Sequence, residues 1–394
     1  MNRRMWGEER RNAPVMVGVD IGSVGVRVVV TALQEQPRPY NAVARATPQT
    51  IQVLGLGEAV TRGMRRGSAT DADALGESLH EAVAIAQAQS GHRVLRATLT
   101  VPLTVFETPR GGARVSLPTR ETVREVLRPT CPHADIWDDV AAAAGIELAG
   151  VIPGAVAAMA GTVLPEEQAA GVALVECGAE QTSVAVVADG AVQRVVALPV
   201  GGDHITRDLA TLLGIRPMEA ERLKLLVGNM RSVHETEYPA RGVDGARKMI
   251  AAALVAAIVA ARVEQIMQRV AEVIRPMHGY GLGGLRARAV ESVVLCGGGA
   301  ALSGIAHMAR GILGVPVRIA GPWGVVGSGE AQTPGYAATL GVVRWWEMTQ
   351  TGRVPGTPLV RDSNSNSNIP SAVNWSAGRP GQSRWQAWLR EFLP

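Results

Sequence analysis

Residues 173–187 read ALVECGAEQTSVAVV. Valine, alanine and leucine flank a short polar centre, which predicts a strand, a tight turn and a second strand. A turn of this kind can direct backbone N–H groups toward a phosphate. This one carries two glutamates, Glu176 and Glu180, and a single glycine, Gly178. The sequence therefore raises the question of whether the turn accepts a phosphate group.

Two other segments repeat the pattern of an apolar strand followed by a glycine turn. Residues 15–31, VMVGVDIGSVGVRVVVT, predict a β-hairpin with its turn at 22–25. Residues 292–305, SVVLCGGGAALSGI, predict a strand, a glycine-rich turn and a helix. The triplets DIG and ECG occupy equivalent points of the two hairpins, which indicates a duplication. We therefore expect two related α/β halves, each with a five-stranded mixed sheet, facing one cleft.

Composition limits the possible classes of protein. The chain has 394 residues, 47% hydrophobic and 19% charged, with a net charge of +4. This charge is too small to indicate nucleic-acid binding. The three scattered cysteines form no metal or disulfide pattern, which favours a reducing compartment. The most apolar run, 250–261, is too short to span a membrane and predicts a buried helix instead. The helices expected here cover 71–90, 203–213, 217–228 and 245–275.

The three turns together predict a phosphate site. Glycine lets the backbone approach phosphate oxygens closely, and N–H groups supply donors without a charged side chain. Asp20 stands at the end of the first strand, where its carboxylate could hold a hydrated Mg²⁺ between the phosphate arms.

Several motifs in order along 15–345 resemble the superfamily of actin, sugar kinases and Hsp70 ATPases. Within it, the segments LPVGGDHITRDLATLLGI, PMEAERLKLLVG, VVLCGGGAALSGI, PVRIAGP and TPGYAATLGVV are similar to the bacterial cell-division protein family FtsA. The resemblance implies an α/β, actin-like (ribonuclease H-like) fold. Two duplicated domains would surround a nucleotide cleft, with a shortened inserted subdomain.

The resemblance implies ATP and Mg²⁺ as cofactors, with the metal bound through water at Asp20. The nucleotide-binding residues that it implies are Asp20, Gly22, Ser23, Gly178, Thr182, Gly201, Gly202, Glu221, Lys224, Gly297, Gly298 and Gly299. For Glu221 and Lys224, which would flank the ribose and adenine, the alternative is an i,i+3 surface ion pair.

The second turn departs from the family pattern. Relatives usually read Asp-x-Gly-Gly-Gly-Thr-Thr-Asp, whereas residues 176–183 read ECGAEQTS. A carboxylate on Glu180 facing a phosphate opposes binding, and Ser183 replaces the closing acid. In the first turn, Gly25 replaces the lysine of many relatives. We therefore expect ATP binding with weak or no ATPase activity. No catalytic residue is assigned, and Glu176 and Thr182 are the candidates.

The resemblance also implies an organisation along the chain. We expect a flexible N-terminal arm at 1–13, a first actin-like domain in two parts at 14–91 and 136–200, a shortened inserted subdomain at 92–135, a second actin-like domain at 201–330, a helix closing onto the first domain at 331–350, a disordered linker at 351–383 and an amphipathic membrane-targeting helix at 384–394.

The C-terminal segment SRWQAWLREFLP has apolar residues at i, i+3, i+4, i+7 and i+8, which form one helical stripe. Tryptophan suits the membrane interface, and arginine suits anionic head groups. A helix docked on its own domain would not need the preceding linker, which is rich in Ser, Asn, Gly and Pro. The predicted membrane residues are Arg384, Trp385, Trp388, Leu389, Arg390, Phe392 and Leu393.

Three functions are compatible with these features. The first is a scaffold at the cytoplasmic face of the cell membrane at the division site, with the FtsZ C-terminal peptide, further copies of itself in a filament, anionic inner-membrane lipid and other division proteins as partners. The second is a PilM-like cytoplasmic platform of a type IV pilus or secretion system, whose relatives generally lack the amphipathic tail. The third, a sugar kinase, is disfavoured because Ser183 stands where a catalytic acid is needed.

Overall fold

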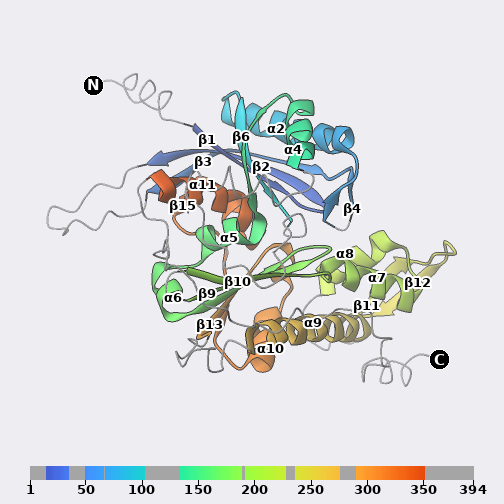
Figure 1. Cartoon of the computed structure of the whole chain (residues 1–394). Coiled ribbons are helices and arrows are strands. Elements are labelled where there is room, and N and C mark those ends of the chain that lie inside the picture. The colour runs from blue at the N-terminus through green and yellow to red at the C-terminus, as the bar shows by residue number, and fades with distance from the viewer. Residues whose placement is uncertain are drawn as a thin grey trace, which may run out of the picture.

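The computed structural model describes residues 15–34, 49–65, 67–102, 134–188, 191–227, 236–275 and 290–350. The predicted N-terminal arm, the linker at 351–383 and the amphipathic helix at 384–394 lie outside these residues, as does most of the predicted inserted subdomain. The boundaries proposed for these segments remain predictions. The described chain forms two stacked α/β halves, as Figure 1 shows.

The first half is built on a six-stranded sheet with the order β15-β3-β2-β1-β6-β7. Its strands are β1 (Val15–Ile21), β2 (Gly25–Gln34), β3 (Thr50–Val60), β6 (Arg96–Val101), β7 (Glu147–Pro153) and β15 (Val325–Val326). The first three are antiparallel to one another, whereas β6 and β7 run parallel to β1. The expectation of five strands was wrong here because β15, from far along the chain, adds to the edge at β3.

The second half is built on a five-stranded sheet with the order β10-β9-β8-β13-β14. Its strands are β8 (Val172–Cys177), β9 (Thr182–Ala188), β10 (Ala191–Leu198), β13 (Ser292–Cys296) and β14 (Val317–Ile319). Again three antiparallel strands are followed by two parallel ones. The two sheets therefore share one topology, which is how the duplication of the hairpins appears in space.

Helices cover both faces of each sheet. In Figure 1, α5 (Gly154–Thr162) and α11 (Ala337–Gln350) lie between the sheets, with α2 (Ala72–Ser90) and α4 (Ala134–Ala143) on the outside of the first. The outside of the second sheet carries α9 (Ala252–Ile274) and α10 (Ile305–Leu313). The helices α5 and α11 approach closely, because a Cβ on Gly161 would lie 2.9 Å from the Ala337 carbonyl oxygen and 3.0 Å from the Gly341 Cα.

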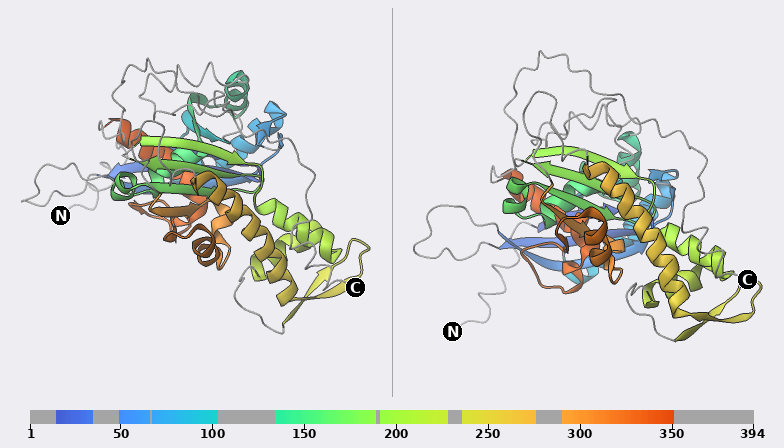
Figure 2. Two further views of the ribbon diagram at one scale, coloured as in Figure 1. Left: turned by 60° about the horizontal axis from the view of Figure 1, so that its bottom comes forward. Right: turned by 90° about the horizontal axis from the view of Figure 1, so that it is seen from below.

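A smaller unit projects from the second half beside the outer end of α9. It contains α7 (Gly202–Leu213), α8 (Pro217–Val227) and the hairpin of β11 (Glu237–Arg241) and β12 (Arg247–Ala251), and Figure 2 shows α9 running from the sheet to this hairpin. The helix predicted at 245–275 was wrong over its first residues. Residues 247–251 form a strand because they pair with residues 237–241, and this pairing is not visible in the local sequence pattern of 245–275.

The apolar run at 250–261 is buried within the protein as expected. Val255, Ile258 and Val259 on α9 pack in the core of the second half. Within the described residues, no helix combines the length and hydropathy required to span a bilayer. The remaining short elements are β4 (Met64–Arg65), β5 (Ser68–Ala69), α6 (Pro165–Ala170) and the 3₁₀ turns η4 (Gly298–Ala301), η5 (Glu330–Gln332) and η6 (Pro334–Tyr336).

Candidate functional site: a cleft between the two halves

Turns from both halves meet around one cavity of about 530 Å³. Gly22, Gly178 and Gly298 all line it, as expected for walls contributed by both sheets. The other predicted nucleotide-binding residues at the cavity are Asp20, Ser23, Gly202, Glu221, Lys224, Gly297 and Gly299. Thr182 and Gly201 do not line it.

The first turn is a tight one that closes the β1–β2 hairpin. The N–H of Gly22 donates to the Gly25 carbonyl at 3.1 Å, and the Thr61 hydroxyl donates to the Gly22 carbonyl at 2.7 Å. Asp20 precedes this turn and accepts a hydrogen bond from the Thr100 hydroxyl at 2.5 Å. Burial raises the pKa of Asp20, while the Arg27 charge and the Thr100 hydrogen bond oppose that rise.

The start of α7 holds the second turn through backbone hydrogen bonds. The N–H of Gly178 donates to the Gln181 carbonyl at 3.0 Å, which closes the turn. The N–H groups of Gly202 and Asp203 donate to the carbonyls of Gly178 and Ala179 at 3.0 and 2.8 Å. The first N–H groups of α7 therefore hold the turn in place.

Gly201 and Thr182 contact the backbone next to the second turn and do not line the cavity itself. A Cβ on Gly201 would lie 2.5 Å from the carbonyl oxygens of Gly178 and Ala179, so glycine permits the close approach of α7 to the turn. Thr182 is fully buried, and its hydroxyl donates to the Val200 carbonyl at 2.8 Å. The Thr182 hydroxyl is therefore engaged by the backbone of the segment that leads into α7, and the nucleotide role expected for Thr182 stays a prediction.

The second turn places two carboxyl groups at the cavity. Burial, together with the negative charge of Asp20, raises the pKa of Glu176 to about 8. Glu180 also lines the cavity, and its Oε2 is buried without a hydrogen-bond partner among the described residues. The cavity is lined by the carboxyl groups of Asp20, Glu176, Glu180, Asp203 and Glu221 and by the cations Arg27 and Lys224.

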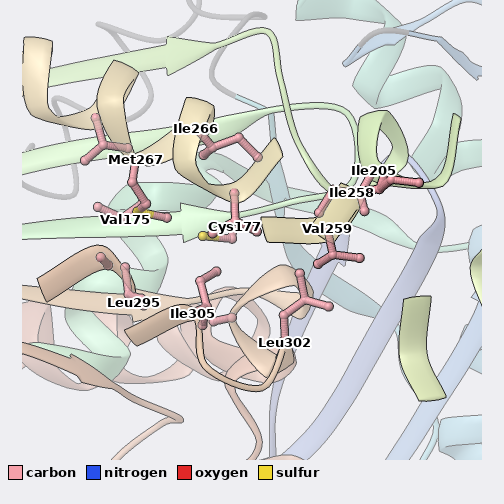
Figure 3. Close-up of a cluster of buried hydrophobic side chains, with 14 of the residues drawn as sticks. Val175, Cys177, Ile205, Ile258, Val259, Ile266, Met267, Leu295, Leu302 and Ile305 are labelled. Carbon is pink, nitrogen blue, oxygen red and sulfur yellow. The ribbon is translucent and has the colours of Figure 1, made fainter. Parts of the chain in front are cut away.

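The glycine run after β13 combines a backbone conformation that only glycine readily adopts with an open surface. Gly297 has φ +80° and ψ 169°, a region that is essentially restricted to glycine. A Cβ on Gly299 would lie 2.9 Å from the Cys177 Cβ, whereas a Cβ on Gly298 would meet nothing within 4 Å. Figure 3 shows the apolar support around these turns, where Cys177, Leu302 and Ile305 pack with side chains of α9.

Glu221 and Lys224 form an i,i+3 ion pair, the arrangement that the sequence offered as the alternative to a nucleotide contact, and both residues also line the cavity. The Lys224 Nζ lies 2.6 Å from the Glu221 Oε2 and donates to the Thr206 hydroxyl at 3.0 Å. The Lys224 side chain is only 9% exposed, whereas that of Glu221 is 43% exposed. A simple surface pair would leave both residues in solvent.

Sequence reasoning missed Arg27, which lines the cavity opposite Asp20. In the β1–β2 hairpin, Asp20 and Arg27 are directly paired across the strands. The turn predicted at 22–25 already fixes this register, so the signal was present in the sequence.

Comparisons with known proteins agree with this architecture. The family described as "Cell division protein FtsA" matches residues 173–341. The "Cell division protein FtsA" of Rhizobium meliloti (strain 1021) is 24% identical over 441 residues, which cover 97% of this chain and 95% of that protein.

Two solved structures show the same fold at low sequence identity. The PilM–PilN type IV pilus biogenesis complex gives a TM-score of 0.59 at 15% identity, covering 86% of this chain and 99% of that one. MreB5 of Spiroplasma citri bound to ADP gives 0.54 at 16% identity, covering 86% and 98%. The chain is thus a divergent relative of the FtsA cell-division proteins, built on the actin-like fold.

Proposed function

We propose that this chain is a cell-division protein that binds ATP with Mg²⁺ in the cleft, assembles with further copies of itself and tethers the tubulin-like FtsZ to the cytoplasmic membrane. The observation that supports nucleotide binding best is the meeting of three glycine turns, from both halves, at one cavity. The likeness to FtsA proteins over nearly the whole chain supports the division role.

The residues at the cavity fit a nucleotide accompanied by a cation. A volume of about 530 Å³ lies within the usual range of ligand pockets. The open surface at Gly298 leaves room for the adenosine side. The lining is rich in carboxyl groups, which suit a divalent cation and would repel a bare polyphosphate.

The chain's own residues then have distinct roles. Asp20 would hold the hydrated metal, and Glu221 and Lys224 would flank the ribose and adenine. Mg²⁺, when bound, neutralises phosphate charge. Glu176, with a pKa near 8, is largely protonated at neutral pH and is a poor acceptor for the proton of an attacking water. Ser183 cannot replace it, so we infer that hydrolysis is slow or absent.

The nucleotide proposal is tested by titrating the full chain with a fluorescent ATP analogue in the presence of Mg²⁺. Asp20→Ala should weaken binding because it removes the carboxylate that holds the metal. Asp139→Ala, at an exposed position on α4, is the matched control and should bind like the wild type. A wild-type protein that takes up no nucleotide would refute the proposal.

Membrane attachment is proposed for the amphipathic residues 384–394, linked by a slack tether at 351–383. A large apolar side chain contributes about 1.5–3 kcal/mol when fully buried, and less at an interface. Arg384 and Arg390 should add about 1 kcal/mol each on anionic lipid. A single short helix of this strength binds reversibly, so stable attachment requires many copies in a polymer.

Vesicle sedimentation tests the anchor. Deletion of 384–394 should abolish pelleting with anionic vesicles and leave nucleotide binding intact, and Trp388→Glu should do nearly the same by placing a charge within the apolar stripe. Polymerised protein that sediments with the vesicles should also bind a peptide from the FtsZ C-terminus and carry it into the pellet. If the full chain ignores vesicles even when polymerised, the PilM-like platform, whose fold this chain shares, becomes the better function.

A further inference from the structure

One row of polar side chains crosses four neighbouring strands at the cleft. Asp20 on β1 is paired with Arg27 on β2, and Arg27 is paired with Glu58 on β3. On the other side of Asp20, Thr100 is its partner on β6. Directly opposed residues on neighbouring strands project from the same face of the sheet. The row therefore directs Asp20 and Arg27 together toward the cavity that both of them line.

Arg27 is held at one end of its guanidinium and retains donors toward the cavity. Its Nη2 lies 2.9 Å from the Glu58 Oε1, while its Nη1 lies 3.9 Å from the Asp20 Oδ2. The Arg27 side chain is 26% exposed, and the guanidinium carbon lies 5.7 Å from the centre of the Tyr336 ring. A guanidinium has five N–H donors in a planar fork that suits phosphate oxygens.

Gly25, close to Arg27 on the same strand, leaves space for the Arg27 head group. Gly25 is not among the glycines with positive φ, so its backbone conformation does not require glycine. A Cβ at this position would lie 3.1 Å from the Glu58 Oε1 and 3.9 Å from the Arg27 Nη2. A side chain growing from residue 25 would therefore enter the space that Glu58 and the Arg27 head group occupy.

The remaining charges leave Arg27 as the cation available to a ligand on this side of the cleft. Lys224, the other cation that lines the cavity in the described part of the chain, is already bonded to Glu221, Thr206 and the Gly202 carbonyl. The surrounding carboxylates would repel a phosphate. A ligand with several phosphate oxygens needs a positive group near the first turn, and among the described residues that line the cavity Arg27 offers one there.

We propose that Arg27 is the phosphate-binding cation of the first turn, and that it takes over the role of the lysine that many relatives carry at the position of Gly25. This inference rests on the proposed nucleotide binding and names a residue through which that binding acts. The ligand class is a nucleoside di- or triphosphate. On binding, Arg27 keeps its bond to Glu58 and turns its free donors from Asp20 to phosphate oxygens, which releases the Asp20 carboxylate for the metal.

Competition titrations with adenosine, ADP and ATP at saturating Mg²⁺ test this role on the full chain. Arg27→Gln keeps much of the side chain's length and removes the charge. It should weaken ADP and ATP about 10-fold to 100-fold, the usual effect of losing a hydrogen bond between charged groups. Adenosine, which has no phosphate, should bind as before. Arg27→Lys should retain part of the affinity, and Gly25→Lys added to Arg27→Gln should recover at least about tenfold.

Arg96→Gln is the matched control, because Arg96 lies on β6 of the same sheet in an exposed pair with Glu147 and does not line the cavity. Melting temperatures within a few degrees of the wild type will show that each variant folds. Equal losses for adenosine and ATP would overturn the inference, since they indicate a structural effect. Unchanged ADP and ATP binding in Arg27→Gln would overturn it as well. If the wild type binds none of the three ligands, the proposed function fails first and this inference fails with it.

Discussion

Replacing Glu180 should strengthen nucleotide binding, because this carboxylate faces the cleft without a partner. Its Oε2 is buried and unbonded among the described residues, and it stands in the turn that Gly178 and Gln181 close. Two unit charges about 6 Å apart at an effective dielectric of about 20 interact by about 3 kcal/mol. Because about 1.4 kcal/mol corresponds to a tenfold change in affinity, this repulsion amounts to about two decades.

Two variants separate charge from shape. Glu180→Gln keeps the size of the side chain and removes its charge, so it should bind ATP with Mg²⁺ up to about 100-fold more tightly. Glu180→Gly also restores close backbone approach and should bind at least as tightly. Glu291→Gln is the control, because Glu291 is an exposed glutamate just before β13, in the same half of the protein.

Titration with a labelled nucleotide at several Mg²⁺ concentrations provides the measurement. Unchanged affinity in Glu180→Gln would refute the reasoning, since the side chain would then not face a phosphate. Weaker binding in both variants would refute it in the opposite direction and assign the Glu180 carboxylate to the metal.

Three further predictions concern the supporting structure. The pKa of Glu176 is raised from the ordinary value of 4.5 to about 8 in the folded protein, so folding is favoured while this carboxyl is protonated. The free energy of unfolding of the wild type should therefore decrease as the pH rises from about 5 to about 8, whereas that of Glu176→Gln should not. Urea unfolding across that range will show the difference. Gly297→Ala should destabilise the protein by about 1–3 kcal/mol or more, since its backbone conformation is essentially restricted to glycine, whereas Gly298→Ala, at an open position, should change little in the same unfolding assay. Glu347→Gln should lower the free energy of unfolding by about 3–5 kcal/mol in a denaturant titration, because the fully buried Arg344 guanidinium loses the negative charge that compensates it. A change below about 1 kcal/mol would show that this charge pair is not needed.

Local patterns were sufficient for the elements that carry their own start and stop signals. The hairpin at 15–31 was predictable because alternating apolar residues surround a short turn, and Gly22 and Gly25 close it as expected. The helix predicted at 71–90 begins after Asp71, whose side chain accepts a hydrogen bond from the Ala74 N–H, and ends at Gly91 in the left-handed conformation. Such caps depend on residues within a few positions, so the sequence alone determines them.

Pairings between distant segments were not predictable in the same way. Residues 247–251 continue smoothly into an apolar helix in the sequence, but they become a strand because 237–241 lie beside them. The edge strand β15 has only two residues and exists because β3 is available to it. The stabilising hydrogen bonds in both cases come from another part of the chain, which a local pattern does not contain.

The candidate site divides along the same line. The sequence by itself marked the glycines and Asp20, because close backbone approach and a carboxylate at a strand end leave a signature in residue type. Which side chains reach the cavity became known from the folded arrangement of the strands and helices. This arrangement placed the Lys224–Glu221 pair at the cleft wall, turned the Thr182 hydroxyl to the Val200 carbonyl and brought Arg27 beside Asp20. The direction of a side chain depends on strand register and on what packs behind it, and these are set when the two halves fold around one cleft.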